Sequence, residues 1–402
     1  MRLWLCQGLK QARAGSATSE DAPTERITTE VSHDMQYREY GKTGIMVSAL
    51  GYGAMRLPFD DPEKSAELMR LGMDLGINYI DTAYGYGGEG RSEKYVGMAI
   101  KGRRDKVYVA TKNPMWGDDT AEGWWARLET SLERLDTDYI DFYKVVHGLS
   151  WDVYTSIYEP VLAKEVQKAK DQGLIRHVVC SCHDTPENMI KLVESGAIEG
   201  MLLQYNLLDR RNEPVLARAK ELGVAIEVMG PVGGGRLGMA SEKLASLVPG
   251  VGSTAELALR FVLANPNTTI AFSGMGTEEQ VRENCATASR EEALTSDEIE
   301  AIARTLEENQ KLAELYCTGC EYCLPCPQCV GIPQAFAAMN MHRVWGLTEH
   351  AKQMYAGLGP DKNDKGLLQG DACVECGQCE EKCPQNIKIM EQLKETHEAL
   401  KA

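Results

Sequence analysis

The sequence lacks the features of a membrane-spanning or nucleic-acid-binding protein. None of its apolar runs reaches the ~18 residues that a helix needs to cross a bilayer. Basic residues are outnumbered, with 43 Lys and Arg against 59 Asp and Glu, which leaves a formal net charge of −16. Such an acidic surface argues against nucleic acid or an anionic membrane as a partner. We therefore expect no membrane span and no nucleic-acid interface.

Cysteine is scarce over most of the chain. Of the 13 cysteines, nine fall between residues 317 and 383, and the others are Cys6, Cys180, Cys182 and Cys285. In a chain of this length, regularly spaced and clustered cysteines indicate bound metal rather than disulfides. Metal-binding thiols imply a reducing compartment, so we expect a cytoplasmic protein. We interpret Cys180, Cys182 and Cys285 as small core residues.

The clustered cysteines form two runs of similar spacing. The downstream run ends in Cys-Pro and has the pattern of bacterial two-cluster ferredoxins, in which three thiolates hold one iron–sulfur cube and the fourth holds another. The ligand candidates in the two runs are Cys317, Cys320, Cys323 and Cys326, and Cys373, Cys376, Cys379 and Cys383. Structural zinc is the alternative, but three cysteines in a row at Cys-x-x-Cys-x-x-Cys spacing, followed by Cys-Pro, favour two 4Fe-4S clusters.

The ferredoxin pattern also predicts how the two runs share their ligands. We expect Cys383 to join the first three cysteines of the upstream run, and Cys326 to join the first three of the downstream run. Cys329 is a further cysteine, for which a free thiol and an alternative ligand both remain open.

Periodicity divides the chain into four parts. Residues 1–34 show none and are expected to be a disordered extension, whose apolar start is too short for a signal peptide. Residues 35–290 alternate short β-rich runs with amphipathic stretches, and residues 291–316 are predicted to form a linking helix. Residues 317–402 form the cysteine module, with a helical insert and a charged helix at the end.

The 35–290 segment is predicted to contain eight strand–helix units. The predicted strands are Val47–Gly51, Tyr79–Asp81, Val107–Thr111, Tyr139–Val145, His177–Cys180, Gly200–Leu203, Ala225–Val228 and Thr269–Phe272. An open dinucleotide-binding sheet usually carries G-x-G-x-x-G after its first strand, and Gly51-Tyr-Gly53-Ala-Met-Arg lacks the third glycine. We therefore expect an α/β protein, a closed (β/α)8 TIM barrel followed by a small, mostly helical two-cluster ferredoxin-like domain.

Four chemically active side chains follow the ends of three neighbouring predicted strands. Asp81 ends the second strand and Tyr86 follows it, Lys112 comes just after the third strand, and His147 follows the fourth. Chemistry in such barrels occurs at the C-terminal rim, so these side chains are expected to meet. A phenol is a poor acid near neutral pH, a neighbouring ammonium favours its ionised form, and an imidazole can polarise a carbonyl oxygen.

At these residues the sequence resembles the aldo-keto reductase family, over roughly residues 35–288. The resemblance rests on Met35-Gln-Tyr-Arg-Glu-Tyr-Gly-Lys-Thr-Gly44, Asn78-Tyr-Ile-Asp81-Thr-Ala-Tyr-Gly-Tyr86-Gly, Val109-Ala-Thr-Lys112, Asp138-Tyr-Ile-Asp-Phe-Tyr-Lys-Val-Val-His147 and Glu283-Asn284. It implies a catalytic tetrad of Asp81, Tyr86, Lys112 and His147, with Tyr86 as the proton donor in carbonyl reduction. With the cysteine module, the whole chain looks like the ferredoxin-fused branch of that family.

The resemblance also implies a nicotinamide site, NAD(H) or NADP(H), on the remaining strand ends. The implied contacts are Ser181, Gln204, Gly230, Gly233, Gly234, Gly235, Arg236, Ser273 and Asn284. Members that use NADPH carry a Lys and an Arg for the 2′-phosphate, where this chain has Gly274 and Gln280. That departure keeps NAD(H) open as the preferred cofactor. Tyr205 and Met229 occupy positions where the family usually places an aromatic ring on nicotinamide.

The resulting hypothesis is an NAD(P)-dependent oxidoreductase that acts on an aldehyde, a ketone or an alcohol. Two 4Fe-4S clusters would exchange electrons with the site or with a redox protein partner. The alternative is an iron–sulfur electron-transfer or docking protein whose barrel serves as a scaffold without nicotinamide turnover. The sequence does not identify the substrate.

Overall fold

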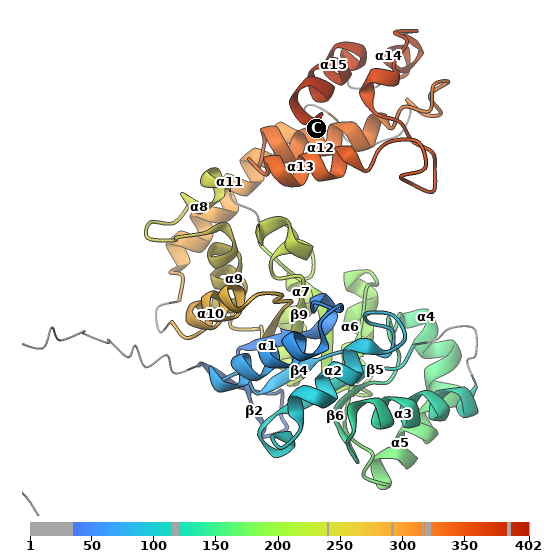
Figure 1. Cartoon of the computed structure of the whole chain (residues 1–402), viewed down its shortest axis with the longest axis vertical. Coiled ribbons are helices and arrows are strands. Elements are labelled where there is room, and N and C mark those ends of the chain that lie inside the picture. The colour runs from blue at the N-terminus through green and yellow to red at the C-terminus, as the bar shows by residue number, and fades with distance from the viewer. Residues whose placement is uncertain are drawn as a thin grey trace, which may run out of the picture. The chain divides into compact units, whose positions relative to one another are not determined.

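A closed barrel of eight parallel strands forms the larger part of the structure, a computed structural model that describes residues 35–114, 120–238, 241–290, 293–314, 317, 323–383 and 387–401. The strand order is β10–β3–β4–β5–β6–β7–β8–β9, with helices on the outside (Figure 1). The strands are Leu50–Gly53 (β3), Tyr79–Asp81 (β4), Tyr108–Lys112 (β5), Ile140–Lys144 (β6), Ile175–Ser181 (β7), Gly200–Gln204 (β8), Ala225–Met229 (β9) and Ile270–Ser273 (β10). The predicted barrel is confirmed.

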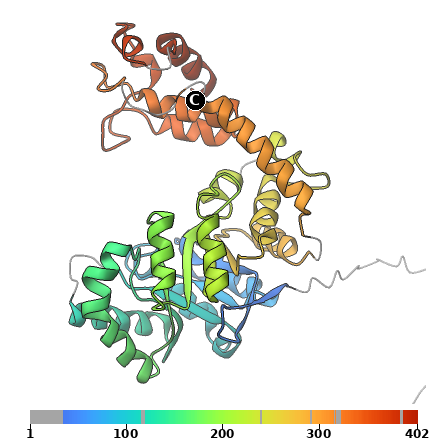
Figure 2. The ribbon, with the colours of Figure 1, turned by 180° about the vertical axis from the view of Figure 1, so that it is seen from behind.

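Helices follow the barrel strands along the chain, and their apolar faces cover the sheet. They are Pro62–Asp74 (α1), Arg91–Ile100 (α2), Ala121–Leu135 (α3), Trp151–Val153 (α4), Ala163–Asp171 (α5), Pro186–Glu194 (α6), Glu213–Leu222 (α7), Glu242–Ala245 (α8), Thr254–Ala264 (α9) and Glu278–Ala288 (α10), with a π-helical segment at Tyr154–Leu162. Figure 2 shows the reverse side, where the green helices α6 and α7 lie next to each other outside the strands. Local signals set the helix starts: Thr120 caps α3 by accepting from the Gly123 N–H, and Pro186 occupies the first turn of α6.

An antiparallel hairpin precedes the barrel, formed by Tyr37–Glu39 (β1) and Met46–Ser48 (β2). The prediction of a single first strand at Val47–Gly51 is wrong, because these residues belong to two strands, the end of β2 and the start of β3. Ser48 pairs with Tyr37 in the hairpin, whereas Leu50 pairs with Ala271 in the barrel. The sequence is apolar on both sides of this change, so periodicity could not locate it.

Two apolar layers hold the barrel together. The larger layer lies between strands and helices and includes Trp124, which is fully buried. The smaller layer fills the barrel interior and contains Tyr79 and Phe142, together with Tyr40 and Val47 from the hairpin. The hairpin therefore closes the N-terminal end of the barrel, and the strands' C-terminal ends remain for the site.

The cysteine module is mostly helical and has an apolar core of its own. Its helices, which follow Ser296–Glu314 (α11), are Ile332–Arg343 (α12), Thr348–Ala356 (α13), Gln378–Glu381 (α14) and Ile389–Leu400 (α15). Helices α12, α13 and α15 contact one another around Phe336, Tyr355 and Leu393 (Figure 1). The predicted helical insert is thus a pair of helices, and Gly346 with φ +66° lies in the turn between them. Within the described ranges, no helix has the length and apolar character that a membrane crossing requires.

Candidate functional site

The acid and the amine predicted for the rim form a buried ion pair. Asp81 ends β4 and Lys112 ends β5, and these strands are neighbours in the barrel. Lys112 Nζ lies 2.5 Å from Asp81 Oδ2 and donates a second hydrogen bond to the Thr82 carbonyl at 2.6 Å. Both side chains are at least 90% removed from solvent. The ammonium therefore has a fixed position beneath the rim.

Tyr86 lies directly over this ammonium. Lys112 Nζ is 4.7 Å from the centre of the Tyr86 ring. The loop after β4 is held by backbone hydrogen bonds from Tyr86 N–H to the Ala83 carbonyl and from Ser92 N–H to the Tyr86 carbonyl. A cation so close to a phenol stabilises the ionised form of that phenol.

His147 completes the predicted group of four. Its ring meets the Tyr86 ring edge to face, with the centroids 6.0 Å apart, and its backbone N–H donates to the backbone carbonyl of Asn113 at 2.7 Å. Burial and the nearby Lys112 ammonium lower the pKa of His147 to about 4. The imidazole is therefore neutral near pH 7 and can donate one ring N–H to an oxygen in the site.

A second lysine, which sequence reasoning missed, also binds Asp81. Lys144 ends β6, is fully buried, and places Nζ 2.8 Å from Asp81 Oδ1 and 2.7 Å from Glu227 Oε2. Burial by itself would raise the pKa of Asp81, but the two ammonium groups outweigh it and bring the pKa below its ordinary value. The signal was present as charged residues in two strands that are buried along most of their length, Asp141 and Lys144 in Ile140–Lys144 and Glu227 in Ala225–Met229.

Three of the predicted cofactor residues lie on adjoining strand ends. Ser181 Oγ, at the end of β7, accepts a hydrogen bond from the Gly148 N–H at 3.0 Å. Gly230 follows β9 with φ +63°, and a Cβ there would stand 2.7 Å from Nε2 of Gln204, which ends β8. The strand ends thus carry a hydroxyl, an amide and a close-packed glycine, donors and space that suit a planar carboxamide ligand.

The other cofactor residues are distributed as follows. Asn284 Nδ2 donates to Ser273 Oγ at 3.0 Å, so α10 and β10 bring these two predicted residues together. Gly233 begins a 3-10 turn, Gly233–Gly238, with φ +60°. Gly234, Gly235 and Arg236 are outside the set of residues whose side chains the structure describes.

Tyr205 does not face the nicotinamide position. Its ring is 1% exposed and packs against Phe261 in the layer between strands and helices. Its hydroxyl donates to Glu213 and accepts from Asn265. The family-based expectation for Tyr205 is wrong here, because the side chain leaves the strand end on the helix side. Met229 instead contacts the apolar interior of the barrel.

The loop after β10 carries no lysine or arginine at the two positions where the family has them. Gln280 Oε1 accepts a hydrogen bond from the Gly276 N–H at 2.8 Å. The aliphatic stem of Arg56 lies 3.1–3.4 Å from the place where Gly274 would carry a Cβ. Arg282 forms an ion pair with Glu278 at 2.8 Å. Two guanidinium groups therefore occur near this loop without aligning with the family's pair.

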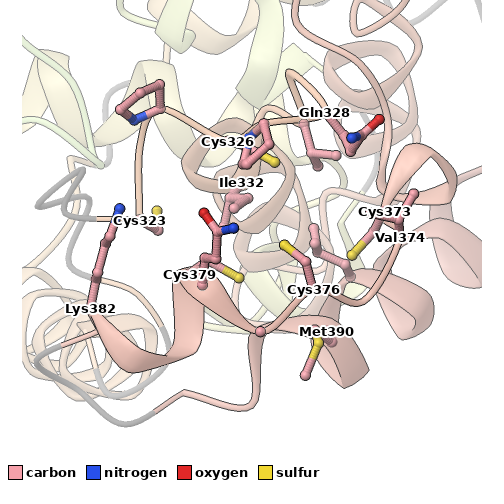
Figure 3. Close-up of a pocket in the computed structure, with 16 residues that line it drawn as sticks. Cys323, Cys326, Gln328, Ile332, Cys373, Val374, Cys376, Cys379, Lys382 and Met390 are labelled. Atoms are coloured by element: carbon pink, nitrogen blue, oxygen red, sulfur yellow. The ribbon is translucent and has the colours of Figure 1, made fainter.

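Cysteines from both sequence runs meet in the C-terminal module. Cys323 and Cys326 from the upstream run line one cavity with Cys373, Cys376 and Cys379 from the downstream run. In Figure 3 the sulfur atoms of Cys326, Cys373, Cys376 and Cys379 surround a common space, and Cys323 lines the same cavity to one side of them. The rest of the wall is mostly apolar and includes Val330, Ile332, Val374, Met390 and Leu393. Four thiols in an apolar wall suit an iron–sulfur cube.

The ligands predicted for the other cluster are described in part. Cys317, Cys323 and Cys383 pack against the module's apolar core, and Cys320 lies outside the described residues. Cys329 is exposed, has φ +53°, and does not line the cavity of Cys326. Among the described side chains, no three His, Cys, Asp or Glu residues are grouped to hold a single metal ion. Cys180, Cys182 and Cys285 are buried in the barrel's outer layer, as predicted.

Comparisons with known proteins agree with this arrangement. The profile of the aldo/keto reductase family matches residues 49–307. The chain belongs to this family. A 4Fe-4S dicluster domain profile matches residues 316–387, so this aldo-keto reductase carries an iron–sulfur domain. It is therefore an oxidoreductase of the aldo-keto reductase type with a C-terminal 4Fe-4S domain.

Individual relatives align with the barrel part of the chain. The "Uncharacterized oxidoreductase YqkF" of Bacillus subtilis (strain 168) is 32% identical, over 67% of this chain and 95% of its own length. The L-galactose dehydrogenase of Arabidopsis thaliana is 29% identical over 67% of this chain and 94% of its own length. Among solved structures, the holo form of aldo-keto reductase AKR11C1 from Bacillus halodurans matches with a TM-score of 0.60 and 31% identity, covering 67% of this chain and 96% of its own.

Proposed function

We propose that the barrel catalyses reversible hydride transfer between a nicotinamide dinucleotide and a carbonyl or alcohol substrate. The observation that carries this proposal is the Tyr86 ring lying 4.7 Å above the Lys112 ammonium, which Asp81 holds in place. A neutral imidazole stands next to the same phenol. An acid, a cation and a hydrogen-bond donor therefore converge where a carbonyl oxygen would bind.

The four side chains have separate roles in this reaction. A bound reduced nicotinamide supplies a hydride to the carbonyl carbon. Tyr86 gives its phenolic proton to the carbonyl oxygen, and the Lys112 ammonium stabilises the phenolate that remains. Asp81 keeps Lys112 in place, and a ring N–H of His147 orients the carbonyl oxygen. In alcohol oxidation the same phenolate accepts the proton.

The strand-end residues support binding of the dinucleotide. Ser181 and Gln204 are the candidate partners of the carboxamide, and Asn284 together with Ser273 forms a polar pair near the end of β10. Gly230 and the Gly233–Gly238 turn allow close approach of a pyrophosphate. The absence of the family's basic pair at Gly274 and Gln280 leaves NAD(H) and NADP(H) both open.

For the C-terminal module we propose two 4Fe-4S clusters that exchange electrons with the barrel site or with a redox protein. Cys326, Cys373, Cys376 and Cys379 would hold one cluster, an assignment supported by the cavity that these four share with Cys323 and by the ferredoxin spacing. Cys317, Cys320, Cys323 and Cys383 would hold the other. In the proposed domain organisation, residues 35–290 form the enzyme barrel, 291–316 a linking helix and 317–402 the cluster domain. We propose a cytoplasmic location.

Replacing Tyr86 tests the enzyme assignment. Anaerobic full-length protein is assayed with NADH and with NADPH on a panel of aliphatic and aromatic aldehydes. Tyr86→Phe should lower kcat by about 10²–10⁴ at unchanged iron content. Tyr84→Phe is a matched control from the same loop, whose ring faces the Arg134 guanidinium at 4.2 Å, and it should keep most of the activity. Turnover retained in Tyr86→Phe would refute the proposed acid.

A nicotinamide titration distinguishes the roles of the clusters. If either reduced nucleotide bleaches the visible cluster absorbance, the clusters exchange electrons with the bound cofactor. Carbonyl turnover without bleaching would assign the clusters to a docking or structural role or to a separate partner. Failure to bind either nucleotide would refute the enzyme proposal and favour a barrel that serves as a scaffold.

A further inference from the structure

A set of four buried charges lies beneath the Tyr86 ring. From the rim inward it comprises Lys112, Asp81, Lys144 and Glu227, each no more than 5% exposed. Asp81 uses a different oxygen for each lysine, Oδ2 for Lys112 and Oδ1 for Lys144. Lys144 then reaches Glu227 Oε2 at 2.7 Å. We call this set the buried charge relay.

The relay is closed at its inner end by two phenols. Tyr40 and Tyr79 each donate to Glu227 Oε1 at 2.6 Å. Burial lowers the pKa of Lys144, but Asp81 and Glu227 outweigh burial and hold it above its ordinary value. Lys144 is therefore charged near neutral pH, as is Asp81, and the set pairs two basic side chains with two acidic ones.

The remaining groups that face the relay are few among the described residues. The Phe272 ring of β10 lies 5.7 Å from Lys144 Nζ, and the fully buried Cys180 thiol of β7 interacts electrostatically with the same lysine and with Glu227. His147 stands at the outer end, and His183 is close enough to affect it. Neither the Cys180 thiol nor His147 carries a charge that would replace Lys144 or Glu227, because burial holds the thiol protonated and His147 neutral.

We propose that Lys144 is a second positioning lysine of the reductase site. It holds Asp81 through Oδ1 so that Oδ2 faces Lys112, and with Glu227 as its counter-ion it keeps the charge beneath Tyr86 balanced. This inference rests on the proposed function, in which Tyr86 is the acid. An ordinary internal ion pair would serve stability alone, whereas a balanced relay also sets how readily Tyr86 ionises.

The relay gives opposite expectations for its two inner members. Lys144→Met leaves two carboxylates and one ammonium beneath Tyr86, an excess negative charge that opposes ionisation of the phenol. Glu227→Gln leaves an excess positive charge that favours ionisation. At low effective dielectric, one charge within the barrel should move the midpoint of Tyr86 ionisation by on the order of one pH unit. The double variant restores the balance and should return the midpoint near that of the unmodified protein.

Tyrosinate absorbance tests this without a substrate. Each protein, with its clusters in place, is titrated against its own Tyr86→Phe counterpart, and the ultraviolet difference reports Tyr86 alone. We expect an upward shift in Lys144→Met, a downward shift in Glu227→Gln, and a shift below about 0.3 pH unit in the double variant. Where Lys144→Met fails to fold, Glu227→Gln and the double variant carry the test.

The outcomes separate this inference from the proposed function. Three results would overturn the role of Lys144. The Tyr86 midpoint could shift in the same direction in both single variants, it could stay unchanged in variants that fold, or it could fail to return in the double variant. A low carbonyl turnover of Tyr86→Phe measured alongside would leave the proposed function standing in that case. Opposite shifts with full turnover in Tyr86→Phe would instead confirm the relay and refute Tyr86 as the acid.

Discussion

The side-chain amide of Gln204 lies against Gly230, so close that a Cβ at position 230 would stand 2.7 Å from Gln204 Nε2. The contact joins the end of β8 to the residue that follows β9. Gly230 also has φ +63°, a conformation that other residues adopt only at a cost of about 1 kcal/mol. The amide and the glycine therefore depend on each other for their positions at the proposed nicotinamide site.

Gly230→Ala should consequently weaken dinucleotide binding, because the new methyl group displaces the Gln204 amide. We expect the Kd for NADH or NADPH, measured by fluorescence titration of anaerobic protein, to rise by about tenfold or more, which corresponds to about 1.4 kcal/mol. Gly173→Ala is the matched control, since Gly173 has φ +75° and open space around its Cβ position. An equal Kd in the two variants would remove Gln204 and Gly230 from the binding site.

His147 should make the stability of the protein sensitive to mild acid. Its pKa is about 4 in the folded chain against an ordinary 6.5, so between these values the unfolded chain takes up a proton that the folded chain does not. Stability contributed by neutral His147 is thus fully present above pH 6.5 and is lost as pH falls from 6.5 toward 4. The loss amounts to up to about 3 kcal/mol.

Urea unfolding of anaerobic protein at several pH values between 7 and 4 checks this expectation. His147→Gln should show a shallower fall of the unfolding midpoint than the unmodified protein. Burial alone would raise the pKa of Glu199, but hydrogen bonds with His177, Val178 and Lys170 lower it to about 2. Glu199 therefore adds a further loss of stability below pH 4.5 in both proteins. Parallel pH profiles would show that His147 is not the group responsible.

Cys326 and Cys329 should differ in their effect on iron content. Cys326 lines the cavity with three downstream cysteines, whereas Cys329 is exposed and lies outside it. Cys326→Ser should therefore lose or weaken one cluster, seen as a drop of about four iron atoms per chain at most. Cys329→Ser should keep its iron. If only Cys329→Ser lost iron, Cys329 would be the cluster ligand, and the cavity lined by Cys326 would not be the cluster site.

The strand ends were predictable because local chemistry and tertiary position agree there. Asp81 ends β4 as predicted, and Lys112, expected just after its strand, is the last residue of β5, since each strand is a short run that stops at a charged residue. The side-chain direction at a strand end is harder to read. Tyr205 follows β8 directly, yet its ring turns to the helix layer where Glu213 and Asn265 satisfy its hydroxyl.

The buried lysine was hidden for a related reason. Lys144 stands within an apolar strand and its partner Glu227 is in β9, more than 80 residues later, so no local pattern connects them. Only the closed barrel brings their inward-facing positions together. The same limit applies to β2 and β3, whose junction near Ala49 depends on pairing with β1 and β10 and not on sequence periodicity.

The hairpin that closes the N-terminal end of the barrel has a consequence for how the protein can be shortened. Tyr40, in the turn of that hairpin, gives Glu227 one of its two phenolic hydrogen bonds. A version of the protein that began at β3 would keep every residue of the rim, but it would admit water to a carboxylate that three successive ion pairs connect to Lys112. Activity lost by such a truncation would report a change in the electric field at Tyr86, the proposed acid, even though no residue of the rim had been removed.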